Sequence, residues 1–504
     1  MQTPRFQFIG RLLGLLITAC PLMAEISPAP PFRDHAILQR NLPLPVWGRA
    51  EPGERILVTF RDQQVGTTTD RDGRWIVCLE PLSASLEPAD LVIAGNTTVT
   101  VRDVLVGEVW LASGQSNMAR RISSLPDAGT VAGTIRNDYI RHLNVEPTPA
   151  AAPADTVTTS GWLPASPVSA GEFSAVAWFF SAELHRKLGV PVGIINASWG
   201  STTIEAWTDA RTLRANPAWP AIETRWQHLV ANLPAIQADY AAWEQRAKAA
   251  QSKGEKIPLP RPLLPFASGT QQALSESFNG MIAPLQPYAL RGVIWYQGES
   301  NVARHAEYPD LFRDLIRAWR AQWGQDRLPF LFVQLPNYND PYDVSGQAWP
   351  WLREAQARAL ELPDTAMAVT IDCGDPQDIH PQNKPIVGRR LARLATVKLY
   401  DLPGDWSGPQ FVAATREGRA MRVTFDHVDT GLTAERLPPQ ALELAGEDRQ
   451  FHPATAVIER NTLLVSSPQV AAPVAVRYAW SNAPVANLFN GAGLPAAPFR
   501  SDGW

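Results

Sequence analysis

The sequence has little charge, few cysteines and no basic stretch, and each shortage excludes a class of protein. Charged residues make up 19% of the 504 positions, and 45 lysines and arginines against 49 acidic residues give a net charge of −4. Binding to nucleic-acid phosphates requires a concentrated basic surface, so we expect no nucleic-acid partner. Only three cysteines are present, and we expect Cys78 and Cys373 to be small buried side chains rather than a disulfide.

Long apolar runs are also missing, except near the N-terminus. Beyond residue 24, no run approaches the ~18 residues that a membrane-spanning helix needs, so we expect no membrane span. Residues 1–24 combine two arginines with a short apolar run, which is typical of an export signal cleaved after Ala24. We therefore expect a periplasmic or extracellular protein. The segment before Cys20 also resembles a lipoprotein box, so an outer-membrane lipid anchor on that cysteine is the alternative.

What the sequence does contain is a change of patterning along the chain. Residues 25–104 and 405–504 have short alternating runs between turn residues, which predicts β-rich accessory segments. Residues 105–404 alternate strand-length apolar runs with helical segments, which predicts a doubly wound parallel α/β sheet. The expected strands are Leu105–Leu111, Val192–Asn196, Gly292–Tyr296, Phe330–Gln334 and Met367–Asp372, and the expected helices are Ala175–Leu188, Pro309–Trp323, Trp351–Leu362 and Pro385–Leu399.

An insertion at 208–276 interrupts this alternation. It holds an Ala-, Gln- and Trp-rich helical stretch at Ala221–Ala250, followed by a proline-rich segment that should be extended. We expect a helical hairpin on the surface, because insertions in a core usually lie there. A partial lid over a site is the alternative.

Ligands of parallel α/β sheets bind beyond the carboxyl ends of the strands, so we expect the catalytic residues in the loops that follow the strands. Ser116 follows the first strand, where a serine is either a helix cap or a nucleophile. His380 follows the last strand, and Asp378 lies two residues before it. An imidazole that is oriented by a carboxylate provides the base that a serine nucleophile needs. Such an Asp–His pair is also common as a structural contact.

Two more loops at the same edge carry glycine and amide side chains, Asn196–Thr202 and Gln297–Asn301. Acyl transfer develops negative charge on the carbonyl oxygen, and backbone N–H groups and neutral amides stabilise that charge. Each loop alone is also compatible with an ordinary turn.

Long motifs surround these residues: Gly107–Met118, Asn279–Leu285, Trp295–Asn301, Asp378–Pro381 and the tail Gly493–Arg500. Together they resemble the sialate O-acetylesterase-like branch of the SGNH hydrolases. The resemblance covers nearly all of the chain after residue 24. It implies a flavodoxin-like core with a jelly-roll-like β-rich accessory domain, and a carbohydrate acetylesterase. We expect no metal or other cofactor, because the eight histidines show no metal-ligand spacing.

The resemblance also implies catalytic roles. Ser116 corresponds to the nucleophile, His380 to the base and Asp378 to the partner of the base. SGNH enzymes more widely place the aspartate three residues before the histidine, where this chain has glutamine. Asp375 and Asp372 are therefore alternatives for the acid.

For the oxyanion hole, the resemblance implies the N–H groups of Ser116 and Gly200 and the side chain of Gln297, with Asn301 in reserve. Ser201 stands where the family commonly has a second glycine, which leaves the backbone donor open.

The expected partner is an acetylated carbohydrate. The export signal and the 18 tryptophans, whose rings can stack on sugars, favour plant cell-wall polysaccharide such as xyloglucan or xylan. O-acetylated sialic acid is the alternative substrate. A non-catalytic carbohydrate-binding protein on an esterase fold is the alternative from another functional class.

Overall fold

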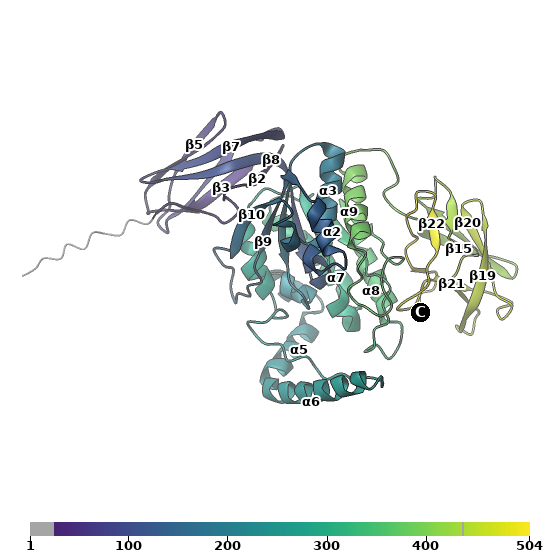
Figure 1. Ribbon diagram of the computed structural model, residues 1–504. Coiled ribbons are helices and arrows are strands. Elements are labelled where there is room, and N and C mark those ends of the chain that lie inside the picture. The colour runs from purple at the N-terminus through teal and green to yellow at the C-terminus, as the bar shows by residue number, and fades with distance from the viewer. Residues whose placement is uncertain (1–24, 436–437) are drawn as a thin grey trace, which may run out of the picture.

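The computed structural model describes residues 25–435 and 438–504. The expected export signal at 1–24, with Cys20, lies outside the described residues. A central α/β body stands between two β-rich ends (Figure 1). The mixed α/β architecture with β-rich flanking segments that the sequence predicts is confirmed. Across the described ranges, none of the helices combines the length and the apolar character needed to cross a bilayer.

The central sheet has the strand order β10-β9-β11-β8-β12-β13-β14. Every neighbouring pair from β9 to β14 is parallel, and β10 is antiparallel at the edge. Every residue of β11, β12, β13 and β14 is buried, as expected for parallel strands covered on both faces. The bounds are β8 Thr98–Gly114, β9 Asn137–Val145, β10 Thr159–Ala165, β11 Val192–Ser198, β12 Gly292–Tyr296, β13 Phe330–Val333 and β14 Thr365–Ala368.

The observed sheet differs from the predicted one in two respects, and each difference has a physical cause. The expected strand Met367–Asp372 is observed as Thr365–Ala368, and the chain turns where the Cys373 N–H donates to Thr370 O. Strands β9 and β10 were not predicted. Strand β9 buries polar residues, with Arg141 paired to Asp103 and the ring of His142 stacked 4.1 Å from that of Phe173, so it lacks the apolar pattern of a buried strand.

The predicted core helices are confirmed within a few residues. Helices α3 and α9 pack against each other, and a Cβ atom at Gly388 of α9 would lie 2.6 Å from the Val176 carbonyl oxygen of α3. Only glycine permits that approach. The helix bounds are α1 Ser116–Ala119, α2 Ala128–Thr134, α3 Ala175–Leu188, α4 Ala210–Ala215, α5 Trp219–Ala231, α6 Leu233–Ser252, α7 Tyr308–Gln322, α8 Ala348–Ala357 and α9 Lys384–Lys398.

The N-terminal β segment is joined to the core by a single long strand. The first part of β8 pairs antiparallel with β7, and its last part lies between β11 and β12 in the central sheet. The preceding strands are β1 Ser27–Pro28, β2 Ile37–Gln39, β3 Leu44–Arg49, β4 Arg55–Phe60, β5 Gln63–Thr68, β6 Arg74–Leu79 and β7 Ser85–Ala94.

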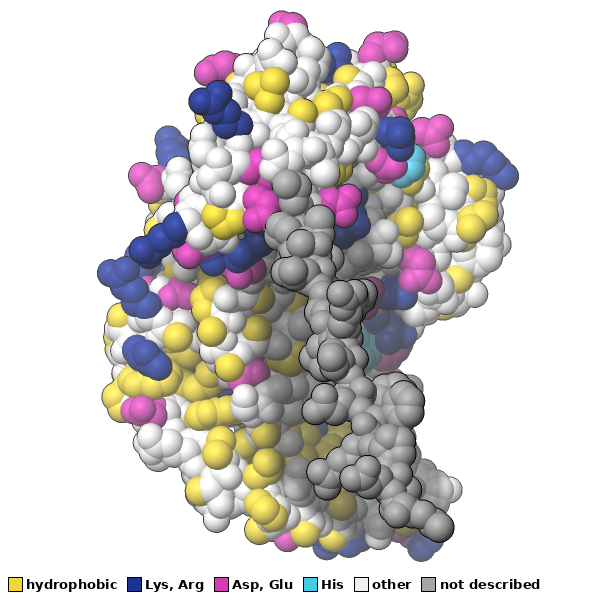
Figure 2. Space-filling view, turned by 90° about the vertical axis from the view of Figure 1, so that its left-hand side faces the viewer, with side chains coloured by type: hydrophobic (Ala, Val, Ile, Leu, Met, Phe, Trp, Pro, Cys, Tyr) yellow, Lys and Arg dark blue, Asp and Glu magenta, His cyan; other side chains and the backbone are white. Residues whose placement is uncertain are grey.

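The C-terminal segment forms its own antiparallel sheet of seven strands, in the order β15-β16-β20-β19-β18-β21-β23. It lies at the opposite end of the core from the N-terminal β segment (Figure 1). On the face drawn in Figure 2, basic and acidic side chains are interspersed. The strands are β15 Gln410–Glu417, β16 Ala420–Asp426, β17 Leu432–Ala434, β18 Leu442–Ala445, β19 Phe451–Glu459, β20 Thr462–Ser466, β21 Ala475–Tyr478, β22 Leu488–Asn490 and β23 Phe499–Arg500.

Both described cysteines are free thiols, so the predicted lack of a disulfide between them is confirmed. Cys373 is buried as predicted, but the predicted burial of Cys78 is wrong. Residues of β6 alternate between exposed and buried, and Cys78 falls on the exposed side.

Candidate active site

Ser116 and His380 meet at the carboxyl edge of the central sheet. The Oγ atom of Ser116 lies 2.9 Å from Nε2 of His380, although 264 residues separate them along the chain. Strand β8 ends at Gly114, which has a φ of +130°. A Cβ atom there would lie 2.1 Å from the Tyr296 carbonyl oxygen, so only glycine fits. The chain therefore leaves the strand abruptly and begins α1 at Ser116.

The surroundings of His380 favour its neutral form. Burial lowers the pKa of the imidazole below its ordinary value, and the charges of Arg120 and Lys384 lower that pKa further. The charge of Asp378 acts in the opposite direction. An imidazole that is neutral near pH 7 can accept a proton, which is what a general base must do.

Of the three candidate acids, Asp378 lies nearest to the ring. Its Oδ1 accepts the backbone N–H of His380 at 2.8 Å and lies 3.8 Å from the ring atom Nδ1, which is longer than a hydrogen bond. The Asp375 carboxylate accepts the backbone N–H of Gln377 at 2.8 Å. Both carboxylate oxygens of Asp372 bind Arg390, at 2.6 and 2.7 Å. The structure therefore places Asp378 beside the histidine ring, whereas the carboxylates of Asp375 and Asp372 contact Gln377 and Arg390.

The loop after β11 approaches the serine closely. A Cβ atom at Gly200 would lie 3.4 Å from Cβ of Ser116, and the Trp199 N–H donates to Gly114 O at 3.0 Å. Within the described residues, the N–H groups of Ser116 and Gly200 have no hydrogen-bond acceptor. Ser201 has a φ of +62°. That is the left-handed region that glycine adopts without cost, which explains why glycine suits this position.

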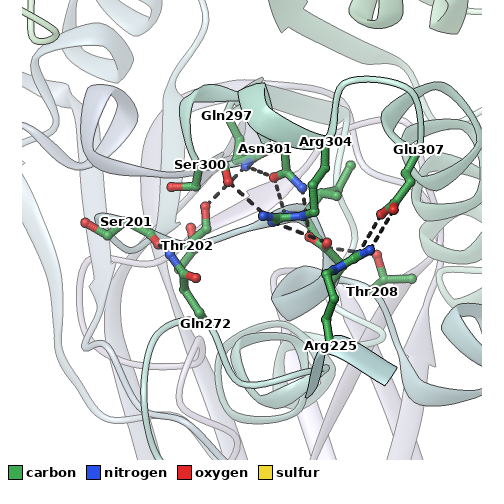
Figure 3. A network of polar contacts seen from close by, with 12 residues as sticks. Ser201, Thr202, Thr208, Arg225, Gln272, Gln297, Ser300, Asn301, Arg304 and Glu307 are labelled. Carbon is green, nitrogen blue, oxygen red and sulfur yellow. Dashed lines mark hydrogen bonds and ion pairs between the residues drawn. The ribbon is translucent and has the colours of Figure 1, made fainter. Parts of the chain in front are cut away.

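Gln297 is completely buried beside this loop, and its amide is fully engaged (Figure 3). Its Nε2 donates to Thr202 O at 3.2 Å and to Oδ1 of Asn301 at 2.8 Å. Its Oε1 accepts the Tyr308 hydroxyl at 3.0 Å. Both N–H bonds of the Gln297 amide are therefore directed at protein atoms, and a direct contact with an oxyanion would require one of them to be released.

Asn301 is buried in the same network (Figure 3). Its Oδ1 accepts the Ile204 N–H at 3.0 Å, and its Nδ2 donates to Glu205 at 2.9 Å. Burial alone would raise the pKa of Glu205, but the charge of Arg304, 3.5 Å away, and the bond from Asn301 hold that pKa below its ordinary value. These contacts fix the 200–205 loop beside the serine.

Sequence reasoning missed several polar residues that support the site. Gln115 Oε1 accepts the backbone N–H groups of Gly298 and Ser300, at 3.2 and 3.3 Å. Gln115 directly precedes Ser116, and Glu299 lies two residues from both Gln297 and Asn301, so both could have been recognised from the long motifs. Glu205 and Arg304 stand outside those motifs, and neither was recognised from the sequence.

The insertion contacts loops on two sides of the site. Gln272 Nε2 donates to Ser201 O at 2.7 Å. On the other side, the Arg261 guanidinium lies 4.2 Å from the ring of Tyr342, in a segment whose Asn339 N–H donates to Pro376 O at 3.0 Å. The predicted helical stretch is two helices, α5 and α6, which extend away from the core in Figure 1. Its return segment and α6, whose Trp243 ring lies 6.0 Å from that of Tyr342, therefore both contact the loops beside the site.

Comparisons with known proteins agree with one another. Residues 266–396 match a family described as carbohydrate esterase, sialic acid-specific acetylesterase. The chain is 28% identical to sialate O-acetylesterase of Mus musculus, with 90% of each chain covered. It is 29% identical to sialate O-acetylesterase of Homo sapiens, over 76% of this chain and 73% of the other. The solved structure of a carbohydrate acetylesterase from Xanthomonas citri is 37% identical, covers 95% of this chain and 100% of its own, and superposes with a TM-score of 0.82.

Proposed function

Because this chain belongs to the sialate O-acetylesterase-like carbohydrate esterases, we propose that it removes O-acetyl groups from sugars with Ser116 as nucleophile and His380 as base. It is a carbohydrate O-acetylesterase, and thus a carboxylic ester hydrolase. The observation that carries the catalytic assignment is the 2.9 Å contact between Ser116 Oγ and His380 Nε2. A non-catalytic binding protein would have no need of that contact.

The proposed reaction has two steps. Ser116 Oγ attacks the acetyl carbonyl carbon while His380 Nε2 takes the hydroxyl proton. The tetrahedral intermediate then expels the sugar oxygen, which receives that proton, and leaves acetyl-Ser116. Water, deprotonated by the same imidazole, attacks the acetyl group; acetic acid departs as that proton passes to Ser116 Oγ, and it loses its own proton to solvent to become acetate. Asp378 stabilises the imidazolium form in both steps.

The oxyanion hole is proposed to consist of the N–H groups of Ser116 and Gly200. Both lie beside the nucleophile and lack an acceptor within the described residues. Removing one such donor typically costs ~10²–10³-fold in rate. Gln297 and Asn301, which the family resemblance offers for this role, hold the Gly200 loop through Thr202 and Ile204.

We assign the core to the flavodoxin-like SGNH fold. Its support is the run of parallel strands, with the Ser116, Gly200, Gln297 and His380 loops all following strands of one sheet. The β-rich ends supply the proposed accessory, jelly-roll-like part.

Plant cell-wall polysaccharide is the proposed substrate, with O-acetylated sialic acid as the alternative. The tryptophan count is weaker support than the sequence indicated, because several tryptophans, among them Trp110, Trp207 and Trp295, are fully buried. Trp199, next to Gly200, is only partly buried and packs against the core. Its position beside Gly200 would allow it to contact a bound sugar.

Release of acetate from defined substrates tests this assignment. Acetylated xyloglucan, acetylated xylan and O-acetylated sialic acid would be compared at equal ester concentration, with the Ser116→Ala protein as background. We expect kcat/KM on a cell-wall polysaccharide to exceed that on the sialic acid ester by about tenfold or more, which corresponds to ~1.4 kcal/mol. The opposite order would assign the sialate substrate.

The pH dependence follows from the state of His380. The base must be neutral, and its pKa lies below the ordinary value of 6.5. Activity is therefore expected to persist below pH 6.5 and to fall at lower pH as the imidazole gains a proton. A profile of kcat/KM on an aryl acetate measures this acid limb. A limb centred above pH 6.5 would contradict the inferred environment of His380.

A further inference from the structure

A second polar cluster contacts the chain neighbours of Ser116 and His380 and has no part in the two-step reaction. It consists of Asn117, Glu299 and Lys384, hereafter the Asn117 cluster. The side chains of Asn117 and Lys384 are almost completely buried, and Oε2 of Glu299 has neither solvent contact nor a hydrogen-bond partner within the described residues. Burying such groups is costly unless they are paired, so the arrangement requires an explanation.

Asn117 is the centre of the cluster. Its Nδ2 donates to Oε1 of Glu299 and, at 3.0 Å, to the backbone oxygen of Ile379. Its Oδ1 accepts the Lys384 ammonium. Asn117 directly follows the serine and Ile379 directly precedes the histidine. One amide side chain therefore ties the loop of the nucleophile to the loop of the base.

Lys384 is held where a cation is poorly accommodated. It is the first residue of α9, and the positive end of a helix dipole disfavours a cation. Burial lowers the pKa of its ammonium to about 7, and the charge of Glu299 acts against that shift. The ammonium also lies 5.7 Å from the centre of the Tyr296 ring. Burial and the helix dipole disfavour the ammonium, and three contacts offset them: the hydrogen bond to Asn117, the charge of Glu299 and the face of the Tyr296 ring.

We propose that the Asn117 cluster is the positioning element that holds Ser116 Oγ and His380 Nε2 at hydrogen-bond distance. The inference rests on the proposed function, since it assumes that this pair performs the chemistry. Asn117, Glu299 and Lys384 are positioning residues: they contact the neighbours of the reacting groups, and they act through them.

The cluster also acts on the histidine through charge. In the pH range where His380 titrates, Lys384 is protonated, because its own pKa is higher, about 7. Its charge opposes protonation of His380. The groups that influence His380 are Arg120, Lys384 and Asp378, and those that influence Lys384 are Glu299, Arg120, Cys373 and Asp378.

Two substitutions test the proposal by different readouts. Asn117→Ala is expected to lower kcat on an aryl acetate by about 10²-fold with little change in KM, because a displacement near 1 Å costs that much. Lys384→Met is expected to lower kcat less and to move the acid limb of the kcat/KM profile to higher pH, since a cation near the imidazole is lost. A purely structural lysine would leave that limb in place.

Lys398→Met is the matched control. Lys398 is the last residue of the same helix, at the opposite end from Lys384, is exposed, and lies 4.0 Å from the ring of Trp406. We expect this variant to keep the wild-type kcat and acid limb. Circular dichroism melting identifies variants that fail to fold. If a variant fails to fold, Asn117→Asp or Glu299→Gln, which preserve the shape of the side chain, takes its place.

The outcomes separate this inference from the proposed function. Folded variants of Asn117 or Glu299 with wild-type kcat, or a Lys384→Met acid limb that coincides with wild type, would overturn the positioning role while leaving the nucleophile assignment intact. Retention of activity by Ser116→Ala would instead overturn the proposed function itself.

Discussion

Replacing Ser116 with alanine is expected to abolish ester hydrolysis, with a fall in kcat on an aryl acetate of about 10⁴-fold or more. Without the hydroxyl, no acetyl-enzyme forms, and His380 has no proton to accept. The residual rate would come from binding and from the free N–H groups beside the site. Initial rates at substrate saturation, together with acetate release from an acetylated glycan, measure the loss.

Ser123→Ala serves as the control for that experiment, because Ser123 is an exposed serine a few residues along the same loop. We expect it to retain full activity. The Ser116→Ala protein should still bind glycan, since the substitution removes only one oxygen atom. Equal rates for Ser116→Ala and wild type would refute catalysis by this serine and leave the carbohydrate-binding reading of the fold.

The second large effect concerns stability rather than catalysis. Arg353 in α8 is fully buried and binds four backbone oxygens. Two of them follow β13, Leu335 O at 2.9 Å and Pro336 O at 2.7 Å. The other two belong to the C-terminal segment, Ser481 O at 2.8 Å and Asn482 O at 2.6 Å. This guanidinium therefore helps to hold the C-terminal β-rich end against the catalytic core, together with other contacts such as the Arg500–Glu354 ion pair.

Arg353→Met is expected to lower the free energy of unfolding by about 3–5 kcal/mol, because four hydrogen bonds to carbonyl oxygens are lost at once, and of these oxygens only Asn482 O keeps another donor among the described residues, the Tyr338 N–H. Burial lowers the pKa of the guanidinium to about 9, so the charge itself is held at a cost, and part of the loss is offset when it is removed. Urea denaturation followed by tryptophan fluorescence measures the change.

Arg358→Met provides the comparison for this variant. Arg358 lies just beyond the end of α8 and forms an exposed 3.6 Å pair with Glu361. Exposed pairs contribute about 0–1 kcal/mol, so this substitution should change stability only slightly. If the two variants unfolded at the same urea concentration, the role of Arg353 as the tie between the two parts would be refuted.

The strands and helices of the core were predictable because each depends on the pattern of apolar residues within its own segment. Apolar runs such as Val192–Asn196 and Gly292–Tyr296 are buried on both faces, and their strand length, apolar character and flanking turn residues identify them. Strand β9 was not predicted because its burial depends on contacts with distant segments. Its buried Arg141 and His142 depend on Asp103 and Phe173, which lie elsewhere in the chain.

The candidate site shows the same division. The positions of Ser116, His380 and the glycine and amide loops after strands follow from motif and topology, since the carboxyl ends of parallel strands share one edge. The sequence does not state how the hydrogen bonds of buried amides are distributed. The Gln297 amide donates its N–H bonds to Thr202 and Asn301. The backbone N–H groups of Ser116 and Gly200 have no acceptor within the described residues.

By itself, then, the sequence determined the family, the alternation of strands and helices, and the residues that gather at one edge of the sheet. Only the tertiary structure decided which of those residues are free to act and which are engaged in support. It also revealed Lys384 behind the site and Arg353 between core and C-terminal end. The reason is physical: a buried polar group must find its partner wherever the fold supplies one, and here the partners of Asn117, and two of the four partners of Arg353, lie more than a hundred residues away.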